Sequence, residues 1–156
     1  VWASVENDGF GHGQSYSGHA LGCAGALAAL EVLVADGLLQ EVASKGAYLE
    51  SKLRSIAANH PCVGDVRGVG LFYTMELVAD HDSKTPLRKT TEKYTRTIIK
   101  DISDFLFREK NVYVPSDKFG IWVVPPLIVT ESEMDWCCEA IDEALDLVDK
   151  TLSAGK

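Results

Sequence analysis

Apolar residues recur at helical spacing in two neighbouring stretches near the start of the chain. The first runs from about Gly18 to Ala35, and Asp36-Gly37 is expected to end it or bend it. Its many alanines predict a helix that can pack closely on nearly all sides. The second stretch, from Leu38 to about Ala58, carries charged residues on one side only, which predicts one buried face and one exposed face.

The apolar spacing changes from helical to alternating in the middle of the chain. Residues Leu71 to Leu77 alternate, which predicts a strand, and the glycines between Val63 and Gly70 predict a turn or bulge leading into it. Further on, Val112–Val114 and Ile121–Val124 predict two short strands. The connection between them makes this pair a hairpin candidate.

Helical spacing returns twice after these strands. Asp80 to Thr90 is expected to be a polar loop, and Thr91 to Lys110 is expected to be a helix. Thr130 and Glu133 fit the capping box that begins many helices, and an apolar face follows as far as Val148. These elements predict an α+β fold with helices packed on a small, mainly antiparallel sheet.

Composition places the chain among globular proteins and narrows its partners. The chain has 156 residues, 46% of them hydrophobic and 24% charged, with a net charge of -8. The negative charge argues against nucleic acid and against an anionic membrane as partners. The cysteines show neither a pairing pattern nor metal spacing, so we expect free thiols and a cytoplasmic location; they are Cys23, Cys62, Cys137 and Cys138. The chain begins at Val1, and we expect it to be a piece of a longer protein.

A glycine-punctuated polar loop, Gly11 to His19, precedes the first helix and is the main candidate for chemistry. Its glycines let backbone amides approach a ligand, and its hydroxyls add donors, so it could hold an anion. A plain surface loop is the alternative. Residues 13–17 nearly match a serine-hydrolase elbow, but Ser17 stands where glycine is required and no strand precedes it. His12 and His19 lack a third ligand for zinc.

The other titratable residues do not form a recognisable catalytic or metal-binding pattern. Glu139, Asp142 and Glu143 lie opposite the apolar face of the last helix and are expected to be solvated. The lysines lie in loops and on amphipathic faces, without the apolar surroundings that would depress a pKa for Schiff-base chemistry. From its residues alone, the chain therefore offers a loop that could hold an anion but no nucleophile.

Four stretches in order resemble the class III, or omega, aminotransferases, which are pyridoxal-phosphate enzymes of fold type I. The first is the loop from Gly11 to His19 with the helix start that follows, and the second is Val63 to Leu71. The third is Pro125 to Thr130, and the last is Ala140 to Leu145. Together these stretches span nearly the whole chain.

The resemblance implies the C-terminal part of such an enzyme. Residues 1–36 would be the tail of the large cofactor-binding domain with an interdomain helix, and residues 37–156 the small domain. The lysine that binds the cofactor covalently would lie upstream, so the fragment alone is expected to be inactive. The family's phosphate-contacting hydroxyl falls at Ser15, next to Gln14, and both are expected to bind pyridoxal 5'-phosphate of the neighbouring subunit in a homodimer. The substrates would be an amine donor and a 2-oxo acid acceptor.

This chain departs from the family where a substrate carboxylate is bound. Many members have arginine before the proline that matches Pro115, and this chain has Val114. Lys118 could substitute as a point charge, although it lacks the planar fork of arginine; the alternative is a solvated lysine with no part in the site. Arg67, between glycines, is expected to fix a turn or an interdomain contact. The alternative for the whole chain is a stand-alone α+β binding or assembly module without catalytic activity.

Overall fold

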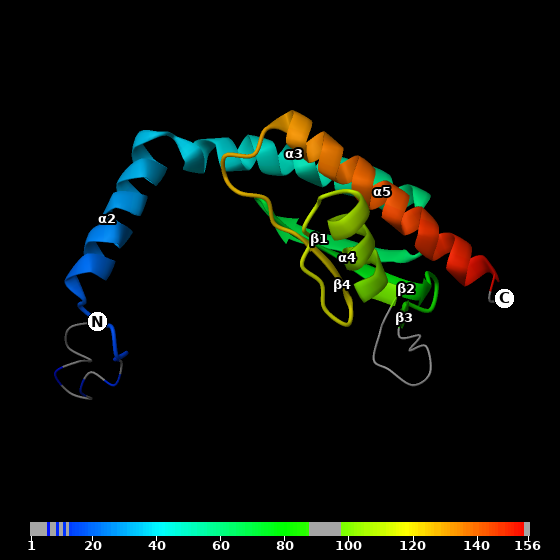
Figure 1. The fold of residues 1–156 in the computed structure, drawn as a ribbon, viewed down its shortest axis with the longest axis horizontal. Helices are drawn as coiled ribbons and strands as arrows, with labels where there is room; N and C mark the ends of the chain where they lie inside the picture. Colours follow the sequence, from blue (N-terminus) through cyan, green and yellow to red (C-terminus); the bar gives the residue numbers. More distant parts are fainter. Residues whose placement is uncertain (1–5, 7–8, 10, 12, 88–97, 155–156) are drawn as a thin grey trace. The chain divides into compact units, whose positions relative to one another are not determined.

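The computed structural model describes residues 6, 9, 11, 13–87 and 98–154 of the chain. It divides into two compact units, Val1–Gly37 and Leu38–Lys156, which we call unit 1 and unit 2. Figure 1 shows the course of the chain through both.

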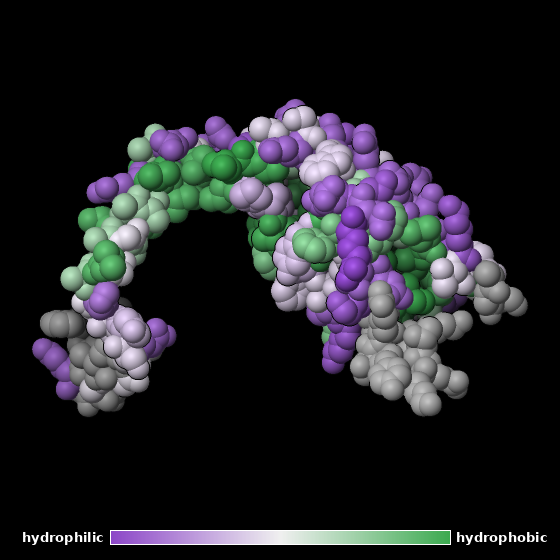
Figure 2. Space-filling model, in the orientation of Figure 1, coloured by the Kyte–Doolittle hydropathy of each residue, from purple (hydrophilic) through white to green (hydrophobic). Residues whose placement is uncertain are grey.

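Helix α2, at Ala20–Ala35, belongs to unit 1. Asp36 ends it, with its backbone N–H donating to the Val32 carbonyl at 3.0 Å, as the Asp36-Gly37 pair predicted. Within the described residues α2 buries none of its side chains, so the close packing expected on nearly all sides is not found there. Figure 2 shows hydrophobic residues along much of this helix. The alanine-rich pattern therefore predicted the helix correctly but not its burial.

The sheet of unit 2 is built around one long strand. Four strands are described: β1 at Val63–Val69, β2 at Phe72–Asp80, β3 at Thr85–Pro86 and β4 at Gly120–Val123. Strand β2 pairs with each of the other three, always antiparallel. The predicted α+β fold with a small antiparallel sheet is confirmed.

Three helices among the described residues accompany this sheet: α3 at Leu38–Asn59, α4 at Ile98–Glu109 and α5 at Glu131–Ala154. Helix α3 packs on β1 and on α5, and α4 packs on α5. Their apolar faces and the inward side of β2 form the core, whose fully buried members include Leu49, Leu53, Met75, Leu77, Ile99, Ile121, Ile141 and Leu145. The visible face of α5 is mostly hydrophilic in Figure 2. Helix α3 thus has the buried face and the exposed face that its sequence predicted.

The start of α5 confirms the predicted capping box. The backbone N–H of Thr130 donates to a Glu133 carboxylate oxygen at 2.8 Å, and the Glu133 N–H donates to the Thr130 hydroxyl at 3.3 Å. These reciprocal bonds satisfy two donors that a helix start leaves unpaired. The cap therefore fixes where the last helix begins.

The prediction of a single strand after the glycines was incomplete. Residues 63–69 themselves form β1, which pairs with β2 as a hairpin. Gly68 lies opposite Tyr73, and a Cβ atom on Gly68 would come within 2.3 Å of the Phe72 carbonyl oxygen and 2.4 Å of the Tyr73 ring. The glycine that looked like a turn signal is needed because backbone and an aromatic ring fill the space that a side chain would occupy.

The predicted hairpin of 112–114 with 121–124 was wrong in its pairing. Residues 112–114 form no strand, and β4 pairs with β2 instead. An isolated bridge joins Ser116 to Ile121, and the Trp122 N–H donates to the Pro115 carbonyl at 2.8 Å. Proline has no N–H to return such a bond, so it interrupts the ladder at this point.

One further boundary differs from the predictions, and another falls partly outside the described residues. The expected polar loop from Asp80 to Thr90 contains the short strand β3. The helix expected from Thr91 begins at Ile98 within the described residues, and residues 88–97 lie outside them. Among the described helices, no single one is long and apolar enough to cross a membrane; α2 and α3 taken together pass that test by length and composition alone.

Candidate functional site

A tight turn of residues 14–18 leads into α2. The Ser17 N–H donates to the Gln14 carbonyl at 2.9 Å, and the Gln14 N–H donates to the Ser17 hydroxyl at 2.9 Å. The His19 N–H donates to the Tyr16 carbonyl at 3.1 Å. Gly18 has φ of 74°, in the left-handed region that glycine adopts without strain. These contacts fix the turn and leave Ser15 at its corner.

The beginning of α2 is arranged to favour an anion. His19 caps the helix, and its ring Nδ1 accepts from the Gly22 N–H at 3.3 Å. The ring also meets Tyr16 edge to face, with centroids 5.5 Å apart. The first turn of α2 contains no acidic residue. The exposed N–H groups and the helix dipole therefore act without a competing carboxylate on the helix.

The two residues expected to contact phosphate, Gln14 and Ser15, are exposed on this turn. Within the described residues, neither side chain is engaged in a hydrogen bond. A hydroxyl and an amide beside a helix start are donors of the kind that bind phosphate oxygens, so the residues present fit a phosphate group. His12, within the predicted loop, and Phe10, just before it, lie outside the described residues.

The two positions considered for substrate recognition, 114 and 118, have different surroundings. Val114 is 4% exposed and belongs to the core of unit 2. Lys118 is exposed, with its Nζ 4.8 Å from the centre of the Phe119 ring. Position 114 therefore faces the interior, whereas the ammonium group of Lys118 is open to solvent.

An apolar cavity of about 290 Å³ lies beside Val114. Its wall includes Trp122 of β4, the two prolines 125 and 126, and Trp136 near the start of α5. Glu133, which caps that helix, is the acidic residue in its lining. The chain thus offers an apolar wall here rather than a cationic clamp.

Arg67 and Lys52 are both held by carboxylates. Arg67 Nη1 lies 2.8 Å from Asp65 on its own strand and 2.6 Å from Glu76 on β2, so it forms ion pairs across the hairpin instead of the expected turn contact. Lys52 Nζ lies 2.8 Å from Asp135, and hydrogen bonds to Asp135 and Tyr48 raise its pKa. A nucleophilic lysine needs a lowered pKa, so Lys52 is unsuited to that role.

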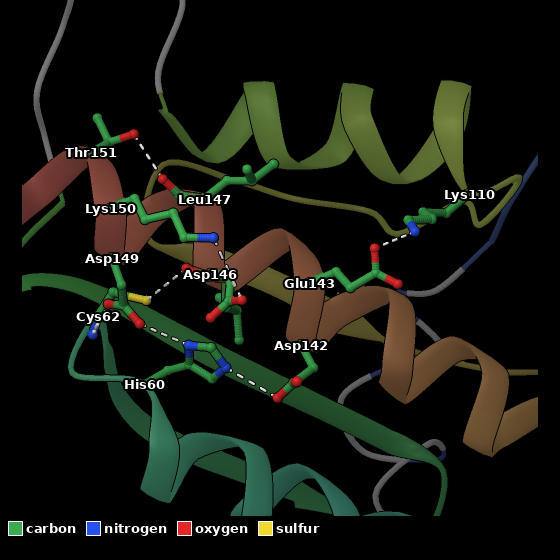
Figure 3. Close-up of polar contacts among 11 residues, drawn as sticks. His60, Cys62, Lys110, Asp142, Glu143, Asp146, Leu147, Asp149, Lys150 and Thr151 are labelled. Atoms are coloured by element: carbon green, nitrogen blue, oxygen red, sulfur yellow. Dashed lines mark hydrogen bonds and ion pairs between the residues drawn. The ribbon is translucent and has the colours of Figure 1, made fainter.

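The contacts around His60 were not expected from the sequence (Figure 3). His60 follows α3 and is 4% exposed. Its Nδ1 lies 2.7 Å from Asp149 Oδ2, and its Nε2 lies 3.1 Å from Asp142 Oδ1. The other oxygen of Asp149 accepts from the Cys62 N–H at 3.0 Å. Glu139 and Glu143 are exposed as expected, and Glu143 also pairs with Lys110. The expectation was incomplete for Asp142, which is half-buried and meets His60.

His60, Cys62 and Asp149 bring one ligand atom each within 4.8 Å of one another, and such atoms can bind zinc. Zinc bonds of about 2.0–2.3 Å at tetrahedral angles keep two ligand atoms roughly 3.3 Å apart or more. The 2.7 Å between His60 Nδ1 and Asp149 Oδ2 is a hydrogen-bond distance instead. Burial, together with Asp149, also raises the pKa of the Cys62 thiol, which disfavours the thiolate that a metal needs. We therefore interpret the cluster as a hydrogen-bonded histidine.

Comparison with known proteins agrees with these features. The family model for class-III aminotransferases matches residues 2–145. A diaminobutyrate–2-oxoglutarate transaminase from Halomonas elongata is 34% identical over 146 residues, which cover 92% of this chain and 30% of that protein. This chain thus spans about 30% of the length of that relative.

Solved structures with the same fold lead to the same family. An (S)-enantioselective omega-transaminase from Thermomicrobium roseum superposes with a TM-score of 0.75 at 34% identity, over 89% of this chain and 30% of that one. The omega transaminase from Pseudomonas jessenii, in complex with PMP, gives a TM-score of 0.79 at 29% identity, over 98% and 32%. The chain therefore belongs to the class-III aminotransferases, a family that depends on pyridoxal phosphate.

Proposed function

We propose that this chain is the C-terminal part of an enzyme that transfers an amino group from an amine or omega-amino acid to a 2-oxo acid. The observation that carries the proposal is the family match over residues 2–145. When bound, pyridoxal phosphate supplies the electron-withdrawing ring that this chemistry requires. In the proposed enzyme, the lysine that binds this cofactor lies upstream of the chain.

The two units have separate places in this proposal. Residues 1–36 form the tail of the large domain and an interdomain helix, and residues 37–156 form the small domain. The division of the chain into compact units at Gly37 supports that boundary. Unit 2 then supplies a wall of the substrate pocket, while unit 1 carries the phosphate-contacting turn.

Ser15 and Gln14 are the proposed cofactor-binding residues. The Ser15 hydroxyl and the Gln14 amide donate to phosphate oxygens of the cofactor bound by the neighbouring subunit of a homodimer. The support is their exposure on a turn whose backbone is fixed by its own hydrogen bonds. Holding the phosphate end fixes the orientation of the cofactor ring without any contact to the reacting atoms.

Lys118 is the proposed partner of the substrate carboxylate. Val114 has no charged group and is buried. Lys118, in the connection before β4, has an exposed ammonium group. A point charge aligns a carboxylate less strictly than the arginine fork found in many relatives. The enzyme should therefore tolerate amine donors that lack a carboxylate.

An amine-donor panel assayed on the full-length protein with pyruvate or 2-oxoglutarate tests the proposed function. Amino transfer from at least one donor supports it, and a full-length protein that binds pyridoxal phosphate but transfers no amino group contradicts it. The stand-alone module likewise predicts no amino transfer.

The 156-residue chain by itself provides a second readout. Mixed with pyridoxal phosphate, it should give no absorbance band of lysine-bound cofactor. A clear band would show that one of its lysines is the covalent partner. We further propose a cytoplasmic location, which the four unpaired thiols support.

A further inference from the structure

His60 joins two parts of unit 2 that are far apart in the sequence. It lies between the end of α3 and the start of β1, and both of its ring nitrogens face carboxylates of α5 (Figure 3). Asp142 and Asp149 are separated by two helical turns, so the ring spans a long stretch of that helix. The contacts therefore tie the C-terminal half of α5 to the α3–β1 connection.

The number of protons on the ring decides whether both contacts are hydrogen bonds. An ionised carboxylate only accepts, and a neutral imidazole carries one N–H. The contacts at 2.7 Å and 3.1 Å can both be hydrogen bonds only when both nitrogens are protonated. In the neutral ring, one nitrogen lone pair would face a carboxylate oxygen inside a buried site.

We propose that His60 is a proton-dependent lock, which holds the C-terminal half of α5 when its ring carries two protons and releases one attachment when it carries one. The attachment that opens is Asp142. Its contact is the longer one, and its side chain is 50% exposed against 22% for Asp149. Asp149 also accepts from the Cys62 N–H, so its position is fixed independently of the ring.

The titration of the ring agrees with this geometry. Burial by itself lowers the pKa of His60, but the hydrogen bonds to Asp149 and Asp142 outweigh it and the pKa is raised. A raised pKa in the folded protein contributes stability that is complete below about 6.5, the ordinary histidine value. That contribution disappears as the pH rises through the pKa of the folded state, so the lock opens on the alkaline side.

Other titratable groups surround the histidine without taking its place. The Cys62 thiol is fully buried with a raised pKa and stays neutral. On the β2–β3 side, Asp80, His81 and Asp82 line a cavity of about 260 Å³ together with Asp149. Lys150 lies on α5 itself and pairs with Asp146. The two carboxylates bonded to the ring are thus the ones whose contacts change when it loses a proton.

Hydrogen exchange in the full-length protein tests the lock. Peptides from residues 142–154 are followed at about pH 6 and about pH 8.5, on either side of the histidine range, with rates corrected for intrinsic exchange. We expect opening of this segment to increase about tenfold for each unit by which the folded-state pKa exceeds the ordinary one. Equal protection at both pH values would overturn the proposal.

Variants separate the lock from a plain structural contact. His60→Gln should remove the pH dependence of exchange in residues 142–154, whereas His81→Gln, an exposed histidine in the nearby turn, should keep it. If His60→Gln does not fold, Asp142→Asn replaces it. This variant removes the carboxylate whose contact with His60 is proposed to open, so it should reduce the pH dependence of exchange in residues 142–154. A pH dependence unchanged in both His60→Gln and Asp142→Asn contradicts the proposal. Protection that appears with added zinc and disappears with a chelator would also contradict it and assign a metal site instead.

Discussion

Unit 2 buries many of its apolar side chains, whereas the described residues of unit 1 bury none. Leu53 and Met75 are 0% exposed, whereas Leu27 and Leu30 of α2 are each 59% exposed. Unit 2 therefore draws stability from its own core, and α2 draws none from a core within the described residues. The polar turn ahead of α2 is exposed as well, which leaves its donors available to a ligand. The stability of unit 2 and the proposed phosphate contact of unit 1 therefore belong to different units, and each can be tested separately.

The largest expected effect is on the core of unit 2. Leu53→Ala removes a fully buried side chain between α3 and the sheet, and should destabilise the protein by about 2–5 kcal/mol. Urea unfolding followed by tryptophan fluorescence measures this change. Ile128→Ala is the control, because that side chain is 71% exposed and should shift the midpoint little. A similar loss of unfolding free energy in both variants would contradict the prediction that the buried side chain stabilises unit 2 more than the exposed one.

The sequence predicted the parts of unit 2 that local rules determine. Helix α3 and the capping box of α5 follow from spacings of three or four residues, which a sequence displays directly. Strand β1 was missed because its glycines resemble turn signals, although Gly68 is required by the Phe72 carbonyl and the ring of Tyr73. Residues 112–114 show buried and exposed side chains in alternation, yet Pro115 and the pairing of β4 with β2 prevent a hairpin.

The site was predictable to a smaller extent. The turn at Ser15 could be located from its glycines and hydroxyls because all of its contacts are local. The partners of His60 lie 82 and 89 residues away, and no local pattern shows such contacts. Its one signal in the sequence was a histidine placed at the end of an amphipathic helix, followed by Pro61. The missed residues were therefore those whose environment depends on tertiary packing.

A smaller effect is expected at the start of α5. Thr130→Ala removes the hydroxyl that accepts from the Glu133 N–H, and should cost about 1 kcal/mol of stability. The same urea unfolding measures it. Ser153→Ala is a matched control, since that hydroxyl bonds the Asp149 carbonyl within its own helix. An equal loss of unfolding free energy in Ser153→Ala would mean that the capping hydroxyl contributes no more stability than an ordinary hydroxyl on the same helix.

The smallest expected effect concerns substrate binding by an exposed side chain of unit 2. Lys118→Ala should raise the KM for pyruvate or 2-oxoglutarate about two- to fivefold, because an exposed charge pair contributes little. Steady-state kinetics of the full-length enzyme measures this change. Lys150→Ala, a similarly exposed lysine on α5, should leave KM unchanged. An unchanged KM in Lys118→Ala removes that residue from the substrate site.

The most direct test of the division between the units is the cofactor affinity of Ser15→Ala in the full-length protein. A hydrogen bond to a charged phosphate contributes about 1.5–3 kcal/mol, so the Kd for pyridoxal phosphate should rise at least about tenfold. Ser44→Ala, which removes an exposed hydroxyl on α3, should leave the Kd unchanged, and neither variant should shift the unfolding midpoint of the cofactor-free protein. A Kd for Ser15→Ala equal to that of the unsubstituted protein would contradict the assignment of the turn to the phosphate.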